Sequence, residues 1–372
     1  MKKKVAIVLH GLQTGGQEVI MARISEYIDS DRVELTYLVA VNERDKQLLE
    51  DDVISHGASV IHLHDLDKRR LFRWPLTLYN AFKKYGPFDA VHANMDLQGG
   101  LIVTVARLAG VPLRICHAHA SDRFCSKHSF IKGLYRNLMR SFIRHNANCR
   151  LACSENAAAF FYHRCSYAIL PNGINLNVFD RNDVERSDCV ESGSGLRIIT
   201  VGRLAPEKNP FFLLDVFDAL YHQIDSVRLT WVGIGRLEEA VREKVYEKGL
   251  DNAVNFLGAR NDVNLLLKNA DCFLFPSLYE SFGLALLEAQ AAGLDCFASD
   301  TIPEIVNCGK CRFLSINDSP ESWAEDILQY YASNTRMKLD RHKLEQFDIR
   351  NMGKKLTQLY VSGSFSSDDA EN

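Results

Sequence analysis

The feature that most constrains the fold of this chain is a repeated alternation between short apolar runs and longer stretches with helical periodicity. In the first half the runs are Val5 to Leu9, Leu35 to Val41, Val60 to Leu63, Ala90 to His92, Arg114 to Cys116 and Leu151 to Cys153. In the second half they are Arg197 to Val201, Arg228 to Val232, Val254 to Leu257, Cys272 to Phe275 and Cys296 to Ala298. Buried strands that alternate with helices form parallel sheets covered by helices. The chain is therefore predicted to be an α/β protein with two doubly wound, Rossmann-like domains.

A polar stretch separates the two series of apolar runs. Residues 180–195 are rich in Asp, Ser and Glu and are interpreted as the interdomain region. A chain of 372 residues is also too long for one ordinary hydrophobic core. We therefore expect an N-terminal domain over residues 1–175 and a C-terminal domain over residues 190–348. A helix over about 350–361 is expected to pack back onto the first domain, and residues 362–372 to form a disordered tail.

The net charge of −3 is unevenly distributed along the chain. Residues 1–173 contain 23 Lys and Arg against 16 Asp and Glu, whereas the remainder contains 21 against 31. The basic half indicates a surface that faces an anionic acceptor or membrane, but its excess is too small for a nucleic-acid-binding protein. The segment from Met1 to Leu9 contains too few consecutive apolar residues to be a signal peptide. We expect a cytoplasmic protein with peripheral contact at the inner membrane face.

The ten cysteines lie mostly inside apolar runs and are interpreted as free thiols in a reducing compartment. Cys308 and Cys311 form a single Cys-x-x-Cys pair. A zinc site would need two further ligands, and no second pair provides them. We therefore expect neither a metal nor a resident cofactor.

The strongest motif is PSLYESFGLALLEAQAAG at residues 276–293, directly after a predicted strand. Gly283 allows the backbone to approach a ligand, and the amides of Phe282 to Leu284 at the start of the next helix can receive phosphate or sugar oxygens. Glu288 lies inside that helix, where a carboxylate can accept both hydroxyl hydrogens of a ribose, and Glu280 in the loop can meet a sugar ring. The alternative for Glu288 is an ordinary solvated residue on a helix face.

Two glutamates separated by seven residues, within ESFGLALLE at residues 280–288, resemble the signature of retaining glycosyltransferase family 4. The segment VGRLAPEK at residues 201–208 resembles the diphosphate clamp of that family, with Arg203 and Lys208 as its cations. Fixed cations stabilise the negative charge that develops on a leaving nucleoside diphosphate, so that two of them can replace a metal. The resemblance runs from Val5 to about Tyr360 and implies the GT-B fold, in which two Rossmann-like domains face each other across a cleft.

Two weaker motifs agree with the resemblance. Gly15 and Gly16 resemble the family's N-terminal glycine loop, which approaches donor phosphate and acceptor; they lack the spacing of a dinucleotide fingerprint, and a plain tight turn is the alternative. Gly258 and Arg260 belong to a segment that resembles the one facing the nucleotide base. Asp65-Leu-Asp67 matches the metal motif of the other major glycosyltransferase fold, but it lies far from the C-terminal signature and is interpreted as a surface loop.

His117 and His119 leave the predicted strand that contains Cys116. Residues two apart in a strand point to one face, so the two imidazoles are expected to share one opening. By resemblance, one of them occupies the position of the family histidine that lines the cleft beside the transferred sugar, with His119 favoured and His117 second. A pair of structural strand histidines is the alternative.

A basic segment in the first half has helical periodicity. Between residues 123 and 144, basic residues recur every four positions beside an apolar stripe: Lys132, Arg136, Arg140 and Arg144 beside Ile131, Leu134, Leu138 and Phe142. This pattern predicts a basic amphipathic helix. Its functional interpretation is a docking surface for anionic lipid or a lipid-diphosphate acceptor, and the alternative is a core-packed helix with a solvated basic face.

The resemblance implies a metal-independent, retaining glycosyltransferase. It would move a hexose or N-acetylhexosamine from a nucleoside-diphosphate sugar, expected to be UDP-linked, to a lipid-linked oligosaccharide in capsule or exopolysaccharide synthesis. Arg203 and Lys208 would hold the diphosphate, Glu288 the ribose, Glu280 the sugar, and His119 would line the reacting face. Two alternatives stay open: a catalytically silent nucleotide-sugar or glycan-binding protein of the same fold, and a nucleotide-sugar epimerase. The sequence does not identify the base, the sugar, the acceptor, the linkage or the oligomeric state.

Overall fold

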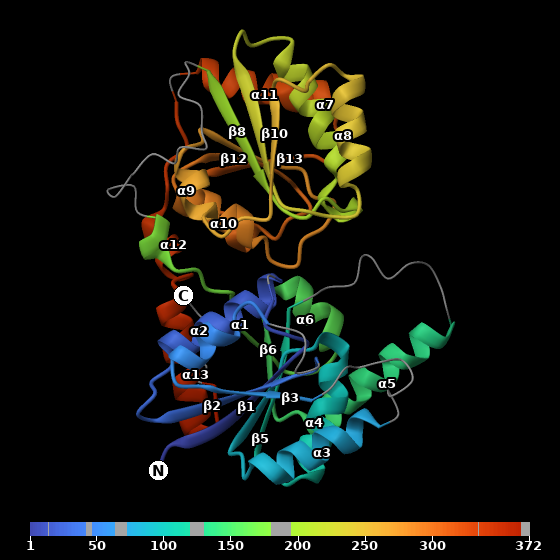
Figure 1. The fold of residues 1–372 in the computed structure, drawn as a ribbon, viewed down its shortest axis with the longest axis vertical. Coiled ribbons are helices and arrows are strands. Elements are labelled where there is room, and N and C mark those ends of the chain that lie inside the picture. The colour runs from blue at the N-terminus through green and yellow to red at the C-terminus, as the bar shows by residue number, and fades with distance from the viewer. Residues whose placement is uncertain are drawn as a thin grey trace. The chain divides into compact units, whose positions relative to one another are not determined.

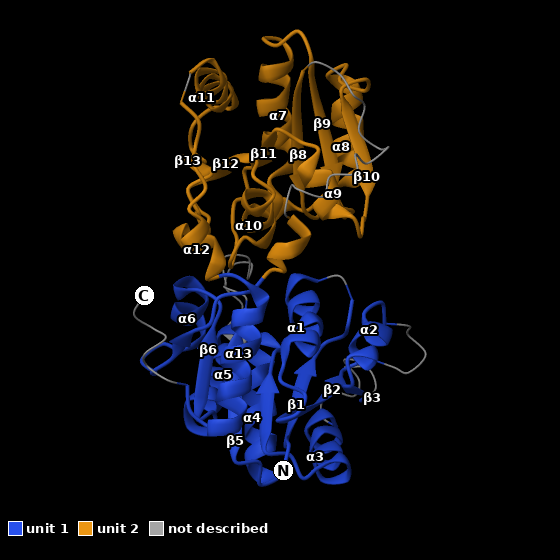
Figure 2. Cartoon of the chain, turned by 90° about the vertical axis from the view of Figure 1, so that its left-hand side faces the viewer, with its two compact units in different colours: residues 1–173, 347–372 blue, residues 174–346 orange. Residues whose placement is uncertain are grey.

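The computed structural model describes residues 1–13, 15–41, 47–63, 73–119, 130–179, 195–333 and 335–365. The chain divides into two compact units, which Figure 2 shows in different colours. Unit 1 comprises residues 1–173 and 347–372, and unit 2 comprises residues 174–346. Each unit contains one parallel sheet with helices packed against it (Figure 1). The predicted α/β fold with two doubly wound domains is confirmed.

Unit 1 contains, within its described residues, a seven-stranded sheet in the order β3-β2-β1-β4-β5-β6-β7. The strands are β1 (Lys3–Leu9), β2 (Val33–Val39), β3 (Ser59–His62), β4 (Ala90–Ala93), β5 (Leu113–Ala118), β6 (Cys149–Ala152) and β7 (Ala168–Ile169). All pairings are parallel; Val5 in β1, for example, is in register with Leu35 and Ala90. The strand order reverses between β1 and β4, so the loops after these two strands lie at the topological switch point of the sheet.

The helices of unit 1 form two layers on the sheet. They are α1 (Gly16–Tyr27), α2 (Glu50–Ser55), α3 (Trp74–Tyr85), η1 (Asp96–Gln98), α4 (Gly99–Leu108), α5 (Phe130–Asn146), α6 (Glu155–Phe161) and α13 (Ile349–Ser362). Helices α1, α2 and α13 lie on one side of the sheet, and α3, α4 and α5 on the other (Figure 1). Both faces of the central strands are therefore buried, which explains why these strands read as continuous apolar runs.

Helix α13 corresponds to the helix expected over about 350–361, and it belongs to unit 1 although the chain reaches it from unit 2. Its apolar face is buried: Ile349, Met352, Leu356, Leu359 and Tyr360. The main-chain N–H of Asp29, just after α1, donates to Thr357 Oγ1 at 3.2 Å. Apolar residues at helical spacing therefore pack this last helix onto the first sheet.

Unit 2 repeats the arrangement with six strands in the order β10-β9-β8-β11-β12-β13, counted over its described residues. The strands are β8 (Leu196–Val201), β9 (Val227–Val232), β10 (Val254–Gly258), β11 (Cys272–Phe275), β12 (Asp295–Ser299) and β13 (Cys311–Leu314). The helices are η2 (Leu176–Phe179), η4 (Pro206–Lys208), α7 (Pro210–Tyr221), α8 (Glu238–Glu247), α9 (Val263–Lys268), α10 (Leu284–Ala291), η5 (Glu304–Val306), α11 (Pro320–Ala332) and α12 (Arg341–Glu345). The switch point of this sheet lies between β8 and β11.

The core of unit 2 is built on the sheet and the two long helices α7 and α11, with Phe217, Trp231 and Trp323 among its buried side chains. This core holds the strand ends in place, so that the loops after β8 and β11 start from rigid positions.

Several predicted features lie outside the described residues. These are the Asp65-Leu-Asp67 pattern, nearly all of the interdomain region, the segment from Arg123 to Ser129, and the last seven residues of the predicted tail. Ser362, the first residue of that tail, is the last residue of α13.

Candidate functional site

The loops after β8 and β11 meet at the switch point of unit 2. The first contains Arg203 and Lys208, and the second contains Glu280. The main-chain N–H of Leu278 donates to the carbonyl of Glu207 at 2.9 Å, which ties the two loops together. Ligands of doubly wound sheets bind at such a point, so the structure places these three motif residues where the topology predicts a ligand site.

Lys208 and Glu280 form an ion pair across these loops. Their side chains are largely buried, with exposed fractions of 18% and 14%. Ser277 Oγ donates to the same carboxylate oxygen of Glu280 at 3.0 Å, and the ammonium of Lys208 lies 4.8 Å from the centre of the Phe275 ring. Partial burial strengthens the attraction between the charges and makes an unpaired partner costly. The arrangement therefore holds one cation and one carboxylate in fixed positions.

Arg203 lies in the same loop as Lys208 but pairs with a different carboxylate. Its Nη2 donates to Glu207 Oε1 at 2.8 Å, and its side chain is 74% exposed. An exposed ion pair of this kind contributes only about 0–1 kcal/mol, so an anionic ligand can compete with Glu207 for the guanidinium. The motif comparison did not reveal Glu207, although the spacing of four residues to Arg203 was a usable signal.

Gly283 positions the start of helix α10. It is the N-cap residue with φ 97° and ψ 46°, a left-handed conformation in which other residues are strained. Phe282 is buried, and Leu284 is the first residue of α10. Because glycine provides no capping side chain, the first amides of α10 remain suited to an oxygen ligand. Glu288, in the second turn of α10, is half-buried.

The loops after β9 and β10 join the same edge of the sheet. Gly233 has φ 138°, and a Cβ atom there would lie 2.1 Å from the carbonyl oxygen of Gly202, so the backbones of two post-strand loops are in close contact. The N–H of Gly233 donates to the carbonyl of Gly258 at 2.8 Å. Arg260 donates to both carboxylate oxygens of Asp262, at 2.8 and 2.6 Å. These bonds lower the pKa of the Asp262 carboxyl, and Asp262 is a partner that the motifs did not reveal.

The glycine loop lies at the switch point of unit 1. Gly15 is the N-cap of α1 and Gly16 is its first residue. The carboxylate of Glu18 accepts a hydrogen bond from the main chain of this loop at 3.1 Å. Gln17 Nε2 donates to the carbonyl of Asn94, which follows β4, at 2.5 Å. Gln17 and Asn94 thus join the loops after β1 and β4, as Lys208 and Glu280 join those after β8 and β11.

His117 and His119 lie side by side at the carboxyl end of β5, as their spacing predicted. Their ring centres are 4.0 Å apart. His117 is completely buried and His119 is 8% exposed. Nε2 of His119 lies 3.0 Å from Oδ1 of Asn94, which links the pair to the loop after β4.

A third histidine, His92, completes this cluster and was not recognised from the sequence. It lies in β4 and is completely buried. Its Nε2 is 3.2 Å from His117 Nδ1, and its Nδ1 is 2.6 Å from the hydroxyl of Tyr360 in α13. A signal was present, because His-Ala-Asn at the end of β4 parallels His-Ala-His at the end of β5.

The three histidines are uncharged near neutral pH. Burial lowers the pKa of His92 to about 3 and that of His119 to about 4, with Asn172 partly opposing the second shift. Burial and the neighbouring imidazoles hold the pKa of His117 well below its usual range. A neutral imidazole has one N–H donor and one acceptor nitrogen, so the cluster can orient a polar group but carries no positive charge.

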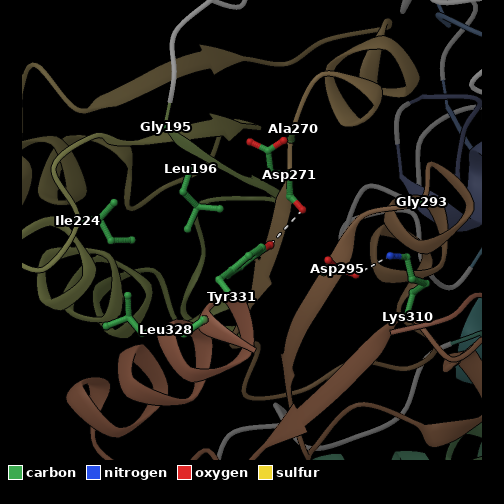
Figure 3. A pocket seen from close by; sticks show the side chains of 11 residues that line it. Gly195, Leu196, Ile224, Ala270, Asp271, Gly293, Asp295, Lys310, Leu328 and Tyr331 are labelled. Atoms are coloured by element: carbon green, nitrogen blue, oxygen red, sulfur yellow. Dashed lines mark hydrogen bonds and ion pairs between the residues drawn. The ribbon is translucent and has the colours of Figure 1, made fainter. Parts of the chain in front are cut away.

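A hollow of about 790 Å³ lies in unit 2 at the amino ends of β8, β11 and β12 (Figure 3). In its wall the hydroxyl of Tyr331 donates to the carbonyl of Asp271 at 3.2 Å, and Lys310 pairs with Asp295 at 2.5 Å. These strand ends are opposite to the carboxyl ends that carry Lys208 and Glu280. The hollow is therefore separate from the predicted donor site.

Within the described ranges, no group of three or more His, Cys, Asp or Glu residues is arranged to hold a metal ion. Cys308 and Cys311 are both buried and unbridged. Burial raises the pKa of the Cys308 thiol to about 11 and also raises the pKa of the Cys311 thiol. Neither thiol is therefore activated as a thiolate.

Two family models match the chain. Residues 14–178 match the model described as Glycosyltransferase Family 4, and residues 185–346 match the model described as Glycosyl transferases group 1. The two matches fall on unit 1 and unit 2, respectively.

Curated relatives extend over most of the chain. EpsF of Bacillus subtilis (strain 168) is 32% identical over 343 residues, covering 89% of this chain and 88% of EpsF. Its name describes it as a glycosyltransferase. The capsular polysaccharide biosynthesis glycosyltransferase CapH of Staphylococcus aureus is 24% identical and covers 96% of this chain and 99% of CapH. The UDP-Gal:alpha-D-GlcNAc-diphosphoundecaprenol alpha-1,3-galactosyltransferase of Escherichia coli is 30% identical over 240 residues, covering 60% of this chain and 61% of that enzyme.

Among solved structures, Anabaena HepE in complex with UDP superimposes with a TM-score of 0.76, covering 97% of this chain and 100% of HepE at 17% sequence identity. This likeness confirms the predicted GT-B fold. Together with the match to EpsF over almost the whole length of both proteins, it shows that the chain belongs to the family 4 glycosyltransferases.

Proposed function

We propose that this glycosyltransferase moves a hexose or N-acetylhexosamine from a UDP-sugar to a hydroxyl of a lipid-linked oligosaccharide, with retention of anomeric configuration, in capsule or exopolysaccharide synthesis. The observation that carries the proposal is the Lys208–Glu280 ion pair at the switch point of unit 2. It places a cation and a carboxylate beside the start of α10, where phosphate and sugar oxygens can be bound.

The proposed roles of the unit 2 residues follow from their chemistry. Arg203 and Lys208 would hold the diphosphate together with the amides of Phe282 to Leu284. Glu288 would accept hydrogen bonds from the ribose, and Glu280 from the transferred sugar. The loop with Gly258 and Arg260 would face the nucleotide base.

The proposed roles of the unit 1 residues concern the acceptor and the reacting bond. Gly15 and Gly16 would let the backbone approach the donor phosphate. His119, with His117 beside it, would line the reacting face as a neutral hydrogen-bonding group.

The names of similar proteins support the choice of donor and acceptor. Solved structures of HepE contain UDP and UDP-glucose. The Escherichia coli relative is named for UDP-Gal and a diphosphoundecaprenol acceptor, and CapH for capsular polysaccharide biosynthesis. A UDP-sugar and a lipid-linked acceptor are the substrates that these names favour.

In the proposed reaction the bond from the anomeric carbon to the diphosphate oxygen breaks as the bond to the acceptor oxygen forms on the same face. The acceptor's hydroxyl proton passes to the leaving diphosphate. Arg203 and Lys208 stabilise the charge that develops on that leaving group, so the step requires no metal ion. Activity that survives EDTA would support metal independence, and activity restored only by a divalent cation would contradict it.

The test begins with thermal unfolding in the presence of UDP, GDP, ADP and their sugars, because a ligand that binds only the folded state raises the midpoint. We expect a shift with UDP and UDP-sugars that is lost in Arg203→Ala and Glu288→Ala. Arg242→Ala is the matched control, because Arg242 forms an exposed ion pair with Glu238 at the same spacing of four residues. No shift with any nucleotide at millimolar concentration would refute the donor site.

Turnover experiments separate the remaining alternatives. A UDP-hexose incubated with an undecaprenyl-diphosphate-linked sugar should yield UDP and an extended lipid whose new linkage retains the anomeric configuration by NMR. An altered sugar nucleotide formed without acceptor would indicate an epimerase, and binding without turnover would indicate a silent binding protein. An inverted linkage would refute the retaining mechanism.

We also propose that helix α5 docks onto an anionic membrane. Leu134 and Leu138, in the predicted apolar stripe, are 63% and 47% exposed, whereas Met139 and Ile143 pack the same helix against unit 1. Lys132 and Arg144 on the same helix are also exposed. A hollow of about 380 Å³ beside α5 is lined by Arg140 and Arg144 together with polar and apolar side chains. Exposed apolar residues flanked by cations suit a surface of anionic headgroups.

Among the described helices, none is long and apolar enough to cross a bilayer. The membrane proposal therefore concerns surface binding, which co-sedimentation with phosphatidylglycerol vesicles measures. We expect binding at low salt that weakens as salt rises and is lost in Leu134→Glu. Leu48→Glu is the matched control, because Leu48 is also 63% exposed in unit 1. Failure to sediment even at low salt, or equal loss in both variants, would contradict the proposal.

A further inference from the structure

The hydroxyl of Tyr360 ties the C-terminal helix to the histidine cluster of unit 1. Tyr360 is 2% exposed, and its hydroxyl lies 2.6 Å from His92 Nδ1. Within the described residues no other hydrogen-bond partner of this hydroxyl is present. Residues 92 and 360 are brought together only because α13 packs on the sheet of unit 1.

The direction of this hydrogen bond follows from burial. If Tyr360 accepted from His92, its own O–H would be buried without an acceptor, and an unsatisfied buried donor is costly. Burial also raises the pKa of the Tyr360 hydroxyl, so that it keeps its proton. Tyr360 therefore donates and His92 Nδ1 accepts.

The tautomers of the next two rings follow in turn. A neutral imidazole with an accepting Nδ1 carries its proton on Nε2. Nε2 of His92 can then donate to His117 Nδ1 at 3.2 Å, which leaves the proton of His117 on its own Nε2. Nε2 of His117 has no hydrogen-bond partner among the described residues, but the main-chain oxygen of Leu170 stabilises a proton on this ring, which favours Nε2–H at His117 over an unsatisfied hydroxyl at Tyr360.

His119 is held in the same tautomer from the other side. The Nδ2 amide of Asn94 donates to the carbonyl of His92 at 3.2 Å, so its Oδ1 faces His119 as an acceptor. His119 then donates from Nε2, and its Nδ1, which has no hydrogen-bond partner among the described residues, is left without a proton. The ring contact between His117 and His119, with centres 4.0 Å apart, joins this bond to the chain that begins at Tyr360.

We propose that Tyr360 is a positioning residue for the reaction: through His92 it sets the tautomer of His117, and the packed ring of His117 then orients His119. The inference deepens the proposed function, because it rests on His119 lining the reacting face. It gives helix α13 a role in the site that no sequence motif within this helix indicates.

The first test needs no activity and no variant. Long-range proton–nitrogen NMR of protein labelled with ¹⁵N-histidine distinguishes Nε2–H from Nδ1–H tautomers. In the wild-type protein we expect His92, His117 and His119 all to be neutral Nε2–H tautomers at pH 7. An Nδ1–H tautomer at His92 or His117 would overturn the proposal even if glycosyl transfer were established.

The second test compares Tyr360→Phe with Tyr37→Phe. Tyr37 is the matched control, because its buried hydroxyl donates to the carbonyl of Met21 at 2.6 Å and not to a histidine. We expect Tyr360→Phe to move His92 toward a mixture of tautomers, whereas Tyr37→Phe leaves the histidine signals in place. Unchanged His92 signals in Tyr360→Phe would refute the inference.

The kinetic consequence is a fall in kcat without a change in donor affinity. With the UDP-hexose that the wild-type protein turns over, Tyr360→Phe should lower kcat roughly 3- to 10-fold, the equivalent of one hydrogen bond, and leave KM for the donor unchanged. Equal kcat values for the Tyr360→Phe and Tyr37→Phe variants would contradict the positioning role. A wild-type protein that turns over no UDP-hexose would refute the proposed function, while the tautomer measurement would still stand.

Discussion

The switch points of the two units share one topology but have opposite chemistry. In unit 2 the loops after β8 and β11 are joined by Lys208 and Glu280, a pair of charges. In unit 1 the corresponding loops, after β1 and β4, are joined by an uncharged hydrogen bond from the Gln17 side-chain amide to the main-chain carbonyl of Asn94, beside buried uncharged histidines. The same strand order therefore determines where a ligand site forms, whereas the side chains at that place determine which chemistry it supports.

This difference agrees with separate roles for the two units in the proposed reaction. A diphosphate donor requires cations, and the loops of unit 2 provide them. Near the transferred sugar an extra positive charge would oppose the development of positive character at the anomeric carbon. Neutral imidazoles, such as those of unit 1, can orient a hydroxyl without that penalty.

The largest effect is expected from neutralising the cation of unit 2. Lys208→Met removes a fixed charge that is proposed to stabilise the leaving diphosphate, so kcat/KM should fall about 100- to 1,000-fold. Initial rates of UDP release measure this loss.

Lys310→Met is the matched control for that experiment. Lys310 and Asp295 form a pair with exposed fractions of 14% and 12%, close to those of Lys208 and Glu280, but at the opposite edge of the sheet. We expect this variant to lose stability yet keep kcat/KM within a few-fold of wild type. Equal losses of activity in the two lysine variants would show that the charge at the carboxyl ends of the strands has no special role in the reaction.

A smaller effect is expected from acid on the stability of unit 1. The pKa values of His92 and His119 are about 3 and about 4 in the folded protein, against about 6.5 in an unfolded chain. Below pH ~6.5 the unfolded chain binds protons that the folded cluster does not. The free energy of unfolding should therefore fall by up to about 1.4 kcal/mol per pH unit for each histidine, down to about pH 4.

Proteolysis in urea at pH 5 and pH 7, with fragments identified by mass spectrometry, measures this effect for each unit. Unit 2 should be less sensitive, because its two histidines, His222 and His342, are exposed. His92→Gln should show a shallower dependence on pH than wild type. A loss of stability shared equally by both units would show that the buried histidines are not its cause.

The smallest effect is expected at the start of α10. Gly283 and Gly249 both have positive φ, but a Cβ at Gly283 would lie 3.2 Å from Ile302, whereas a Cβ at Gly249 meets no atom within 4 Å. Each change to Ala should cost about 1 kcal/mol for the backbone conformation. Gly283→Ala should also weaken binding of UDP, as a smaller thermal shift. If Gly249→Ala reduced that shift as strongly, general destabilisation would explain both results.

Some features of the fold could be predicted from local patterns because the pattern itself causes them. Apolar runs such as Cys272 to Phe275 are buried on both faces of a parallel sheet, and they were recognised for that reason. Periodicity alone did not show which side of a helix faces the core. In α5 the predicted stripe of Leu134 and Leu138 is exposed, while Met139 and Ile143 are buried.

The candidate site shows the same limit. The residues of the 201–208 and 276–293 motifs were recognised by their spacing, but their partners were not. The pairing of Lys208 with Glu280 depends on how two loops meet at the switch point. Arg203 and Glu207 are four residues apart in one loop, so their spacing could have revealed that pair. His92 was missed because its neighbours His117 and Tyr360 are distant in sequence.

The sequence by itself determined the two-domain α/β fold, the loops that carry the donor chemistry and the resemblance to family 4, because each depends on spacing along a short stretch of chain. Only the tertiary structure decided which charges are paired and which histidines are buried and neutral. It alone showed that the last helix reaches the histidine cluster. These properties arise from contacts between residues far apart in the chain, and burial then sets the pKa values and hydrogen-bond directions of the groups that meet there.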